Sequence, residues 1–149
     1  MEQVAIGVGV TLVCILVSGL GFWLAEVFFT HQREWLRRPP HSFKLFLVVT
    51  GAGGLVLGIV LAGVAIWGGI LLWLRVFPDF WTAFYFALCS YTTVGYGDVL
   101  PPGHWRLLGA MAAANGFINI GLLTTLLIEG LQHVRAGYHR TVYGEELDG

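Results

Sequence analysis

The stretch TTVGYGD at residues 92–98 lies between a short aromatic segment, residues 80–91, and a long apolar run. The core of the stretch, residues 93–97, reads TVGYG. An ordinary strand alternates the directions of its carbonyls, so a row of carbonyls that all face one axis needs left-handed backbone angles at alternate residues. Gly95 and Gly97 occupy alternate positions and reach those angles without a Cβ penalty. The stretch therefore predicts a backbone that offers a row of oxygen ligands to a dehydrated cation.

Composition places this chain in a membrane. Of its 149 residues, 56% are hydrophobic and only 11% are charged, whereas a soluble domain carries roughly 25% charged residues. The mean hydropathy is +0.75. A net charge of −1 gives no support for a nucleic-acid partner. The two cysteines, Cys14 and Cys89, both lie in apolar segments and do not form a disulfide framework.

Three apolar segments are long enough to cross a bilayer, which needs roughly 20 residues. They are residues 4–29, 43–76 and 105–134. The first begins without a positive charge and is too long for a signal peptide, so we interpret it as a retained helix. Residues 80–91 are too short to span and are predicted to re-enter the membrane, where irregular backbone must be buried in protein or line a water-filled path. The predicted fold is an all-α membrane protein with three transmembrane helices and a short helix and loop between the second and third.

The orientation follows from the basic residues. Residues 30–44 carry four of the eight Lys and Arg residues, and loops rich in these residues remain in the cytoplasm. The N-terminus is then expected outside and the C-terminus in the cytoplasm. Residues 135–149 are polar and are predicted to form a short tail without a stable helix.

Small residues predict where the first two helices pack, because they let membrane helices approach closely. Each of the first two predicted helices carries one stripe of such residues. The stripe on the first helix consists of Gly7, Thr11, Cys14, Ser18, Gly21 and Ala25. The stripe on the second helix consists of Gly51, Gly54, Gly58, Ala62, Ala65 and Gly69. We expect the two stripes to face each other. The alternative is that each helix packs on a different partner.

The stretch and its surroundings resemble the pore region of potassium channels. Residues 80–91 take the place of the pore helix in that family, with Tyr85 and Phe86 as its aromatic pair, and Trp105 and Arg106 open the inner helix. The resemblance extends over residues 43–134. It implies a homotetramer around a central pore in the plasma or inner membrane, which conducts K⁺ passively. The chain then divides into an N-terminal transmembrane helix (1–30), a cytoplasmic basic link (31–42), the pore module (43–134) and a cytoplasmic tail (135–149).

The resemblance also assigns residues. It implies a selectivity filter in which K⁺ is bound by the carbonyls of Thr93, Val94, Gly95 and Tyr96 and by the Thr93 hydroxyl, with Gly97 at its outer end; support for the filter comes from Thr92, Asp98, Cys89 and Phe86. Cavity-lining residues on the inner helix are Phe117, Ile120 and Thr124, and the candidate hinges are Gly116 and Gly121, which could equally be packing sites. Asn115 and Asn119 need polar partners in the membrane, either on neighbouring helices or in cavity water.

Two positions depart from the family. Cys89 stands where some prokaryotic members carry a glutamate, and Phe86 stands where some carry a tryptophan that reaches the filter aspartate. Phe86 has no donor to offer, so the bracing of Asp98 is the weakest part of the resemblance.

Two rival functions therefore stay open. A looser filter would make a weakly selective cation channel, and the small size of the chain would suit a non-conducting accessory subunit. An enzyme is not indicated, because no metal-ligand spacing or nucleophile–base pair occurs, and ion conduction needs no organic cofactor. Glu129 and His133, one turn apart, fit an interfacial ion pair better than a pH-sensing ring, and His104 fits an interfacial residue.

Overall fold

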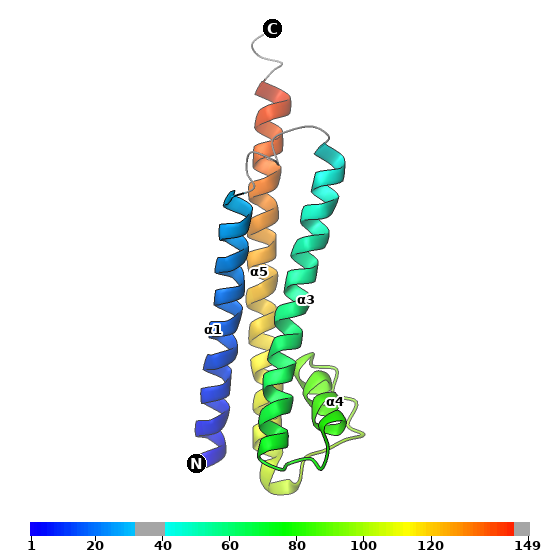
Figure 1. The fold of residues 1–149 in the computed structure, drawn as a ribbon. Coiled ribbons are helices and arrows are strands. Elements are labelled where there is room, and N and C mark those ends of the chain that lie inside the picture. Colours follow the sequence, from blue (N-terminus) through cyan, green and yellow to red (C-terminus); the bar gives the residue numbers. More distant parts are fainter. Residues whose placement is uncertain (32–40, 145–149) are drawn as a thin grey trace.

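The computed structural model describes residues 1–31 and 41–144. These residues form the α-helices α1 (Glu2–His31), α3 (His41–Trp73), α4 (Phe80–Tyr91) and α5 (Arg106–Gly144), with the short 3₁₀ helix η1 (Gly103–Trp105) before α5. The described part of the chain contains no strand. The long helices α1, α3 and α5 lie side by side, and α4 packs at the end of the bundle where the chain begins (Figure 1). The C-terminal end of α5 lies at the opposite end (Figure 1).

Within the described residues, three helices are long and apolar enough to cross a membrane, over Glu2–Leu24, Val49–Trp73 and Gly103–Thr125. The 12 residues of α4 extend about 18 Å at 1.5 Å per residue, less than the roughly 30 Å of a hydrocarbon core. The predicted all-helical fold with three spans is confirmed. The range predicted for the short helix, residues 80–91, coincides with α4.

The predicted ends of the long helices need correction. α3 begins at His41 and α5 continues to Gly144, so residues 135–144 are helical and the prediction of a tail without a helix was wrong there. Hydrogen bonding can extend a polar helix beyond the apolar segment, which hydropathy alone does not reveal. Residues 32–40 of the predicted link and residues 145–149 of the tail lie outside the described residues.

α3 ends in a Schellman motif. The Val76 amide donates to the Leu71 carbonyl at 2.9 Å, and the Arg75 amide donates to the Leu72 carbonyl at 2.9 Å. Arg75 takes the left-handed position of this motif, with φ of +54°. Val76 and Leu71 are both buried, which supplies the hydrophobic contact that usually accompanies the motif. The chain thus reverses direction within a few residues and delivers α4 back against α3.

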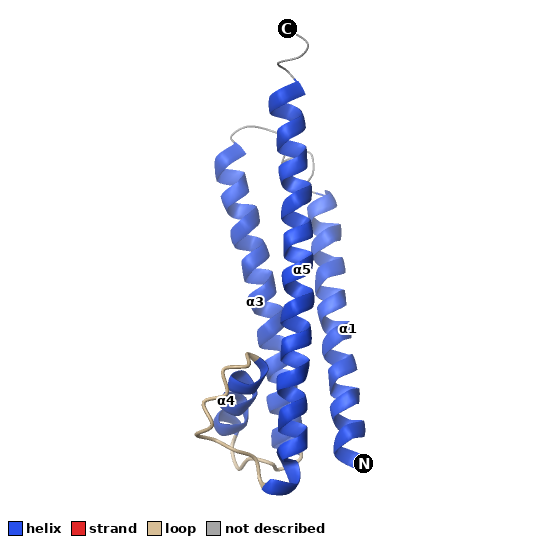
Figure 2. Ribbon diagram, turned by 180° about the vertical axis from the view of Figure 1, so that it is seen from behind, coloured by secondary structure: helices blue, strands red, loops and turns tan. Residues whose placement is uncertain are grey.

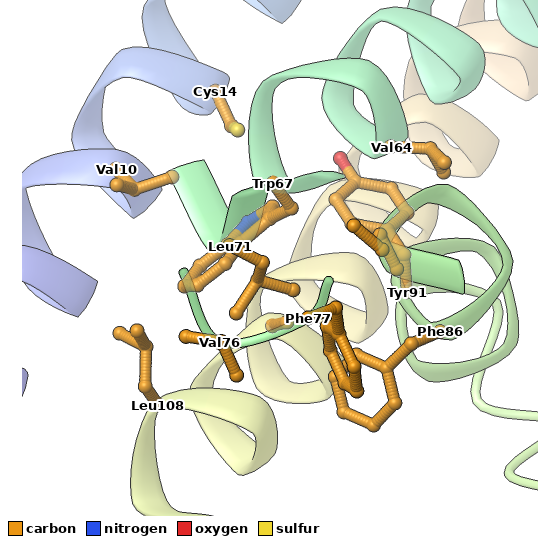
Figure 3. Packing of buried hydrophobic residues seen from close by; sticks show 13 residues of the cluster. Val10, Cys14, Val64, Trp67, Leu71, Val76, Phe77, Phe86, Tyr91 and Leu108 are labelled. Atoms are coloured by element: carbon orange, nitrogen blue, oxygen red, sulfur yellow. The ribbon is translucent and has the colours of Figure 1, made fainter. Parts of the chain in front are cut away.

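One buried cluster joins all four helices. Its largest members are Trp67 from α3 and Tyr91 from α4, both fully buried, with Leu71 and Leu108 beside them. Figure 3 shows these side chains between α3, α4 and α5, with Cys14 of α1 at the border of the cluster. Packing of this kind holds membrane helices together, because lipid offers no hydrophobic driving force between them. The cluster therefore fixes α4 in place within the bundle.

The prediction that the two small-residue stripes face each other was wrong. The α1 stripe does face the bundle, but α1 packs more extensively against α5 than against α3. A Cβ added at Gly7 would meet Met111 of α5, whereas one added at Gly21 would meet Ile59 of α3. The glycines of the α3 stripe have open space in place of a Cβ. Spacing identifies a close-packing face but not the helix that will lie on it.

Candidate functional site

α4 is held at both ends by hydrogen bonds. Asp79 caps its N-terminus, where the carboxylate accepts from the Thr82 amide at 2.9 Å and from the Thr82 hydroxyl at 2.7 Å. These bonds hold the pKa of Asp79 below its usual value. At the other end the Thr92 hydroxyl donates to the Leu88 carbonyl at 2.7 Å. The helix therefore has a defined end from which the TVGYG stretch departs.

The backbone of the stretch alternates in handedness. Thr93, Gly95 and Gly97 have positive φ angles of +61°, +56° and +76°. Left-handed angles were expected at the two glycines from the sequence; the third, at Thr93, was not, because a β-branched residue rarely adopts them. Strained backbone of this kind concentrates at functional sites. The repeat of one left-handed residue in every two is the geometry that a row of carbonyls facing one axis requires.

Two further backbone bonds tie the stretch to α4. The Thr93 amide donates to the Ser90 carbonyl, and the Gly95 amide donates to the Cys89 carbonyl, both at 3.0 Å. Cys89, named above as a filter support, thus contacts the stretch through its main chain. This bond does not depend on the cysteine side chain, because any residue at position 89 offers the same carbonyl.

The donor for Asp98 was missed from the sequence. The Tyr85 hydroxyl donates to the Asp98 carboxylate at 2.7 Å, while Phe86 points into the core and packs on Phe77 with ring centroids 5.0 Å apart. Phe86 offers no donor, as the sequence indicated, and the bracing of Asp98 that this left open comes from Tyr85 instead. The sequence did offer a signal for this donor, because Tyr85, which carries a hydroxyl, stands one position before Phe86.

This bond also sets the charge of the carboxylate. The Tyr85 hydrogen bond holds the pKa of Asp98 below its usual value, against a smaller opposing effect of desolvation. Asp98 also accepts from the Val99 amide at 3.0 Å. The residue after the TVGYG stretch is thus a fixed, ionised carboxylate at neutral pH.

α5 has two contrasting faces. Its buried face includes Leu108, Ala112, Asn115, Asn119 and Leu123. The residues predicted to line a cavity lie on the other side: Phe117 is 72% exposed in the single chain, Thr124 is exposed and Ile120 is partly buried. The Thr124 hydroxyl donates to the Ile120 carbonyl of its own helix at 2.8 Å. The structure thus separates Phe117 and Thr124 from the packed face, with Ile120 at its border, and the role of the three in a cavity stays a prediction.

The two candidate hinge glycines differ. A Cβ at Gly116 would lie 2.5 Å from the Tyr91 carbonyl carbon and closer still to its oxygen, whereas one at Gly121 would meet nothing within 4 Å. Gly116 is therefore a close-packing site, where the backbone of α5 touches the last residue of α4. The side chains of Glu129 and His133 lie outside the described residues.

The two buried asparagines have protein partners. Asn119 accepts a hydrogen bond from Ser18 of α1 at 2.5 Å, and its amide donates to Asn115 at 3.4 Å. Of the alternatives left open by the sequence, the structure gives Asn119 a partner on a neighbouring helix, whereas Asn115 is bonded to Asn119 of its own helix.

The region that contains this site matches known ion channels. A family model described as ion channel matches residues 59–133. The chain is 35% identical to the potassium voltage-gated channel subfamily A member 2 of Xenopus laevis, and equally to that of Mus musculus. Each alignment extends over 71 residues, which is 47% of this chain. A relative of the same name from Oncorhynchus mykiss is 36% identical over 70 residues, or 46% of the chain.

These alignments cover only 13–14% of the relatives' own length. No solved structure matches the chain. The family model reaches from the middle of α3 through α4 and the TVGYG stretch into α5, and covers about half of the 149 residues. The match thus describes the part of the molecule in which a short helix and a strained loop lie between two spans. Because the ion channel model matches half of the chain, the chain belongs to the ion channel family.

Proposed function

We propose that this chain is the subunit of a potassium-selective channel, in which the carbonyls of residues 93–96 bind K⁺ in place of its hydration water. The left-handed angles at Thr93, Gly95 and Gly97 carry the proposal, since they turn consecutive carbonyls toward one side. Rings of backbone carbonyls are the known means of binding dehydrated K⁺. The relatives are named as potassium channels, which supports the same ion.

One chain supplies only one side of such a ring, so the proposed channel is a homotetramer. The stretch is exposed in the single chain: Val94 is 54% exposed and Tyr96 is 73% exposed. Phe117 on the open face of α5 is similarly uncovered. Large apolar side chains at these places would be covered by neighbouring copies, which supports assembly around an axis beside α4 and α5.

Topology supports a passive pore in a cell membrane. α4 and the stretch lie at the same end of the bundle as the N-terminus (Figures 1 and 2), so α4 re-enters from the side on which the chain begins. With the basic link in the cytoplasm, that side is the outside. Conduction by this route uses no organic cofactor and no chemical step.

The test is ion flux from liposomes that contain only the purified protein. Potassium and sodium gradients are compared, barium is added as a blocker, and the mass of the assembly is measured in parallel. The proposal expects a tetramer and a K⁺ flux that exceeds Na⁺ flux and is blocked by barium. Equal fluxes would contradict selectivity, and a monomer without flux would point to an accessory subunit.

A further inference from the structure

α1 runs parallel to α5 and is fixed to it at two levels. The side-chain amide of Gln3 donates to the His104 carbonyl just before α5, and the Ser18 hydroxyl donates to Asn119 at 2.5 Å. Both pairs are separated by 101 residues in sequence, so the two helices keep one register over about four turns at 3.6 residues per turn. α1 is therefore attached to α5 from the outer end to the middle of the bundle.

The inner attachment is a buried polar chain. Ser18, Asn119 and Asn115 are at most 6% exposed, and they are linked by the Ser18–Asn119 bond and by the Asn119–Asn115 bond at 3.4 Å. The Ser18 hydroxyl also lies 2.9 Å from the Cys14 carbonyl of its own helix. Polar side chains inside a membrane are costly unless paired, so the Ser18–Asn119 bond, which joins α1 to α5, holds α5 in one rotation about its axis.

The same segment of α5 touches the base of the TVGYG stretch. Gly116 follows Asn115 directly, and its backbone packs on the carbonyl of Tyr91. Tyr91 is fully buried, and its ring reaches across to α3, where a Cβ at Gly63 would lie 2.6 Å from its Cζ atom. Figure 3 shows the Tyr91 ring beside Val64 of α3. Tyr91 lies two residues before Thr93, the first left-handed residue of the stretch.

From these contacts we propose that α1 positions the inner end of the selectivity filter. Ser18 holds Asn119 and thereby sets the rotation of α5, and α5 in turn holds Tyr91 through Gly116. Loss of the Ser18 hydroxyl would let α5 rotate, and this rotation would relax the strained φ angle at Thr93. Thr93 carries the innermost carbonyl and the hydroxyl that are proposed to bind K⁺. This inference rests on the proposed function, and it makes α1 a positioning element for selectivity as well as a membrane anchor.

The measured quantity is the ratio of K⁺ to Na⁺ flux in liposomes, which does not depend on how many channels assemble. Ser18→Ala removes the hydroxyl, and Asn119→Leu removes its acceptor at similar volume. Hydrogen bonds between membrane helices average about 0.6 kcal/mol, equivalent to a factor of roughly three. We expect the flux ratio to fall roughly threefold or more in both variants. Ser18→Thr, which keeps the hydroxyl, should retain the wild-type ratio.

Thr11→Ala is the matched control. The Thr11 hydroxyl lies on the same helix, two turns earlier, and donates at 2.8 Å to the Gly7 carbonyl of α1 itself, so its loss should leave the ratio unchanged. A Ser18→Ala or Asn119→Leu protein with the wild-type ratio would overturn the inference, even with a lower total flux. If one variant does not assemble, the other is read in the same way. A wild-type protein without K⁺ selectivity would instead contradict the proposed function, before any variant is compared.

Discussion

The Tyr85 hydroxyl and the Asp98 carboxylate lie 2.7 Å apart, so the middle of α4 is tied to the residue that follows the TVGYG stretch. α4 thereby holds the stretch at both ends: at its N-terminal end through the Ser90 and Cys89 carbonyls and at its C-terminal end through Tyr85. A loop with three left-handed residues, of which Thr93 is strained, keeps its shape only when its surroundings hold it. These bonds supply that restraint within one chain.

Tyr85→Phe should raise the pKa of Asp98, because the Tyr85 hydrogen bond is the main reason that this pKa is depressed. A carboxyl whose folded-state pKa is depressed stabilises the fold fully above its ordinary value of 3.8, and this contribution is lost as the pH falls through the lowered value. In the variant, protonation and loss of flux should therefore begin at a higher external pH. Acid titration of K⁺ flux measures the shift.

Thr82→Ala provides the control for this titration. It removes the hydroxyl bond to Asp79 and should raise the pKa of Asp79, since Thr82 is the main cause of its depression, while the acid titration of flux stays that of the wild type. Identical titrations of Tyr85→Phe and the wild type would show that the Tyr85–Asp98 bond does not govern the outer end of the stretch.

Gly95→Ala should abolish K⁺ selectivity without unfolding the protein. A Cβ at Gly95 meets nothing within 4 Å, but φ of +56° costs a non-glycine residue roughly 1–2 kcal/mol. The strain would be relieved by rotation of the carbonyl row. Gly9→Ala on the exposed side of α1 is the control, because it also has open space and no left-handed angle. A selective Gly95→Ala channel would argue against the carbonyl row.

Gly116→Ala should destabilise the bundle by more than Gly121→Ala does. A Cβ at Gly116 would overlap the Tyr91 backbone, and overpacking costs about 1–3 kcal/mol, with rigid backbone at the upper end. At Gly121 the space is open, and alanine gains up to about 1 kcal/mol of helix propensity. Thermal unfolding in detergent compares the two. Equal melting temperatures would contradict the close contact between α5 and α4.

Tyr91→Phe should leave stability unchanged or raise it. The Tyr91 hydroxyl is buried and makes no hydrogen bond of normal distance and angle to the described residues, and an unsatisfied buried group costs about 1–3 kcal/mol. The ring itself is fully buried, so Tyr91→Ala should lose about 3–5 kcal/mol. The melting temperatures of the two variants, measured together, check both statements. A large loss in Tyr91→Phe would reveal a partner for the hydroxyl.

Local patterns predicted the helices and the centre of the site well. Hydropathy located the three spans, the aromatic segment gave the bounds of α4, and the alternation of Gly95 and Gly97 predicted their backbone angles. Each of these features depends on residues close together in the sequence. The left-handed angle at Thr93 was not predicted, because the backbone bonds to α4 override the preference of a β-branched residue.

Contacts between distant segments were predicted poorly. The stripe on α1 identified a packing face, yet the choice of α5 depends on Ser18 meeting Asn119, a pair separated by 101 residues. The donor to Asp98 was sought at Phe86, a position taken from the family, and Tyr85 reaches the carboxylate from one position earlier. Which side chain reaches a given atom depends on the rotation of a helix, and sequence spacing leaves that rotation undetermined.

The most direct test of the carbonyl filter is the position of bound ions in the assembled protein. A structure of the detergent-extracted assembly in thallium, whose scattering marks K⁺ sites, would locate them. The account predicts ion density on a fourfold axis between the carbonyls of residues 93–96 from four copies, and no such density when sodium replaces thallium. An assembly in which the TVGYG stretches do not meet, or in which the ions lie elsewhere, would contradict it.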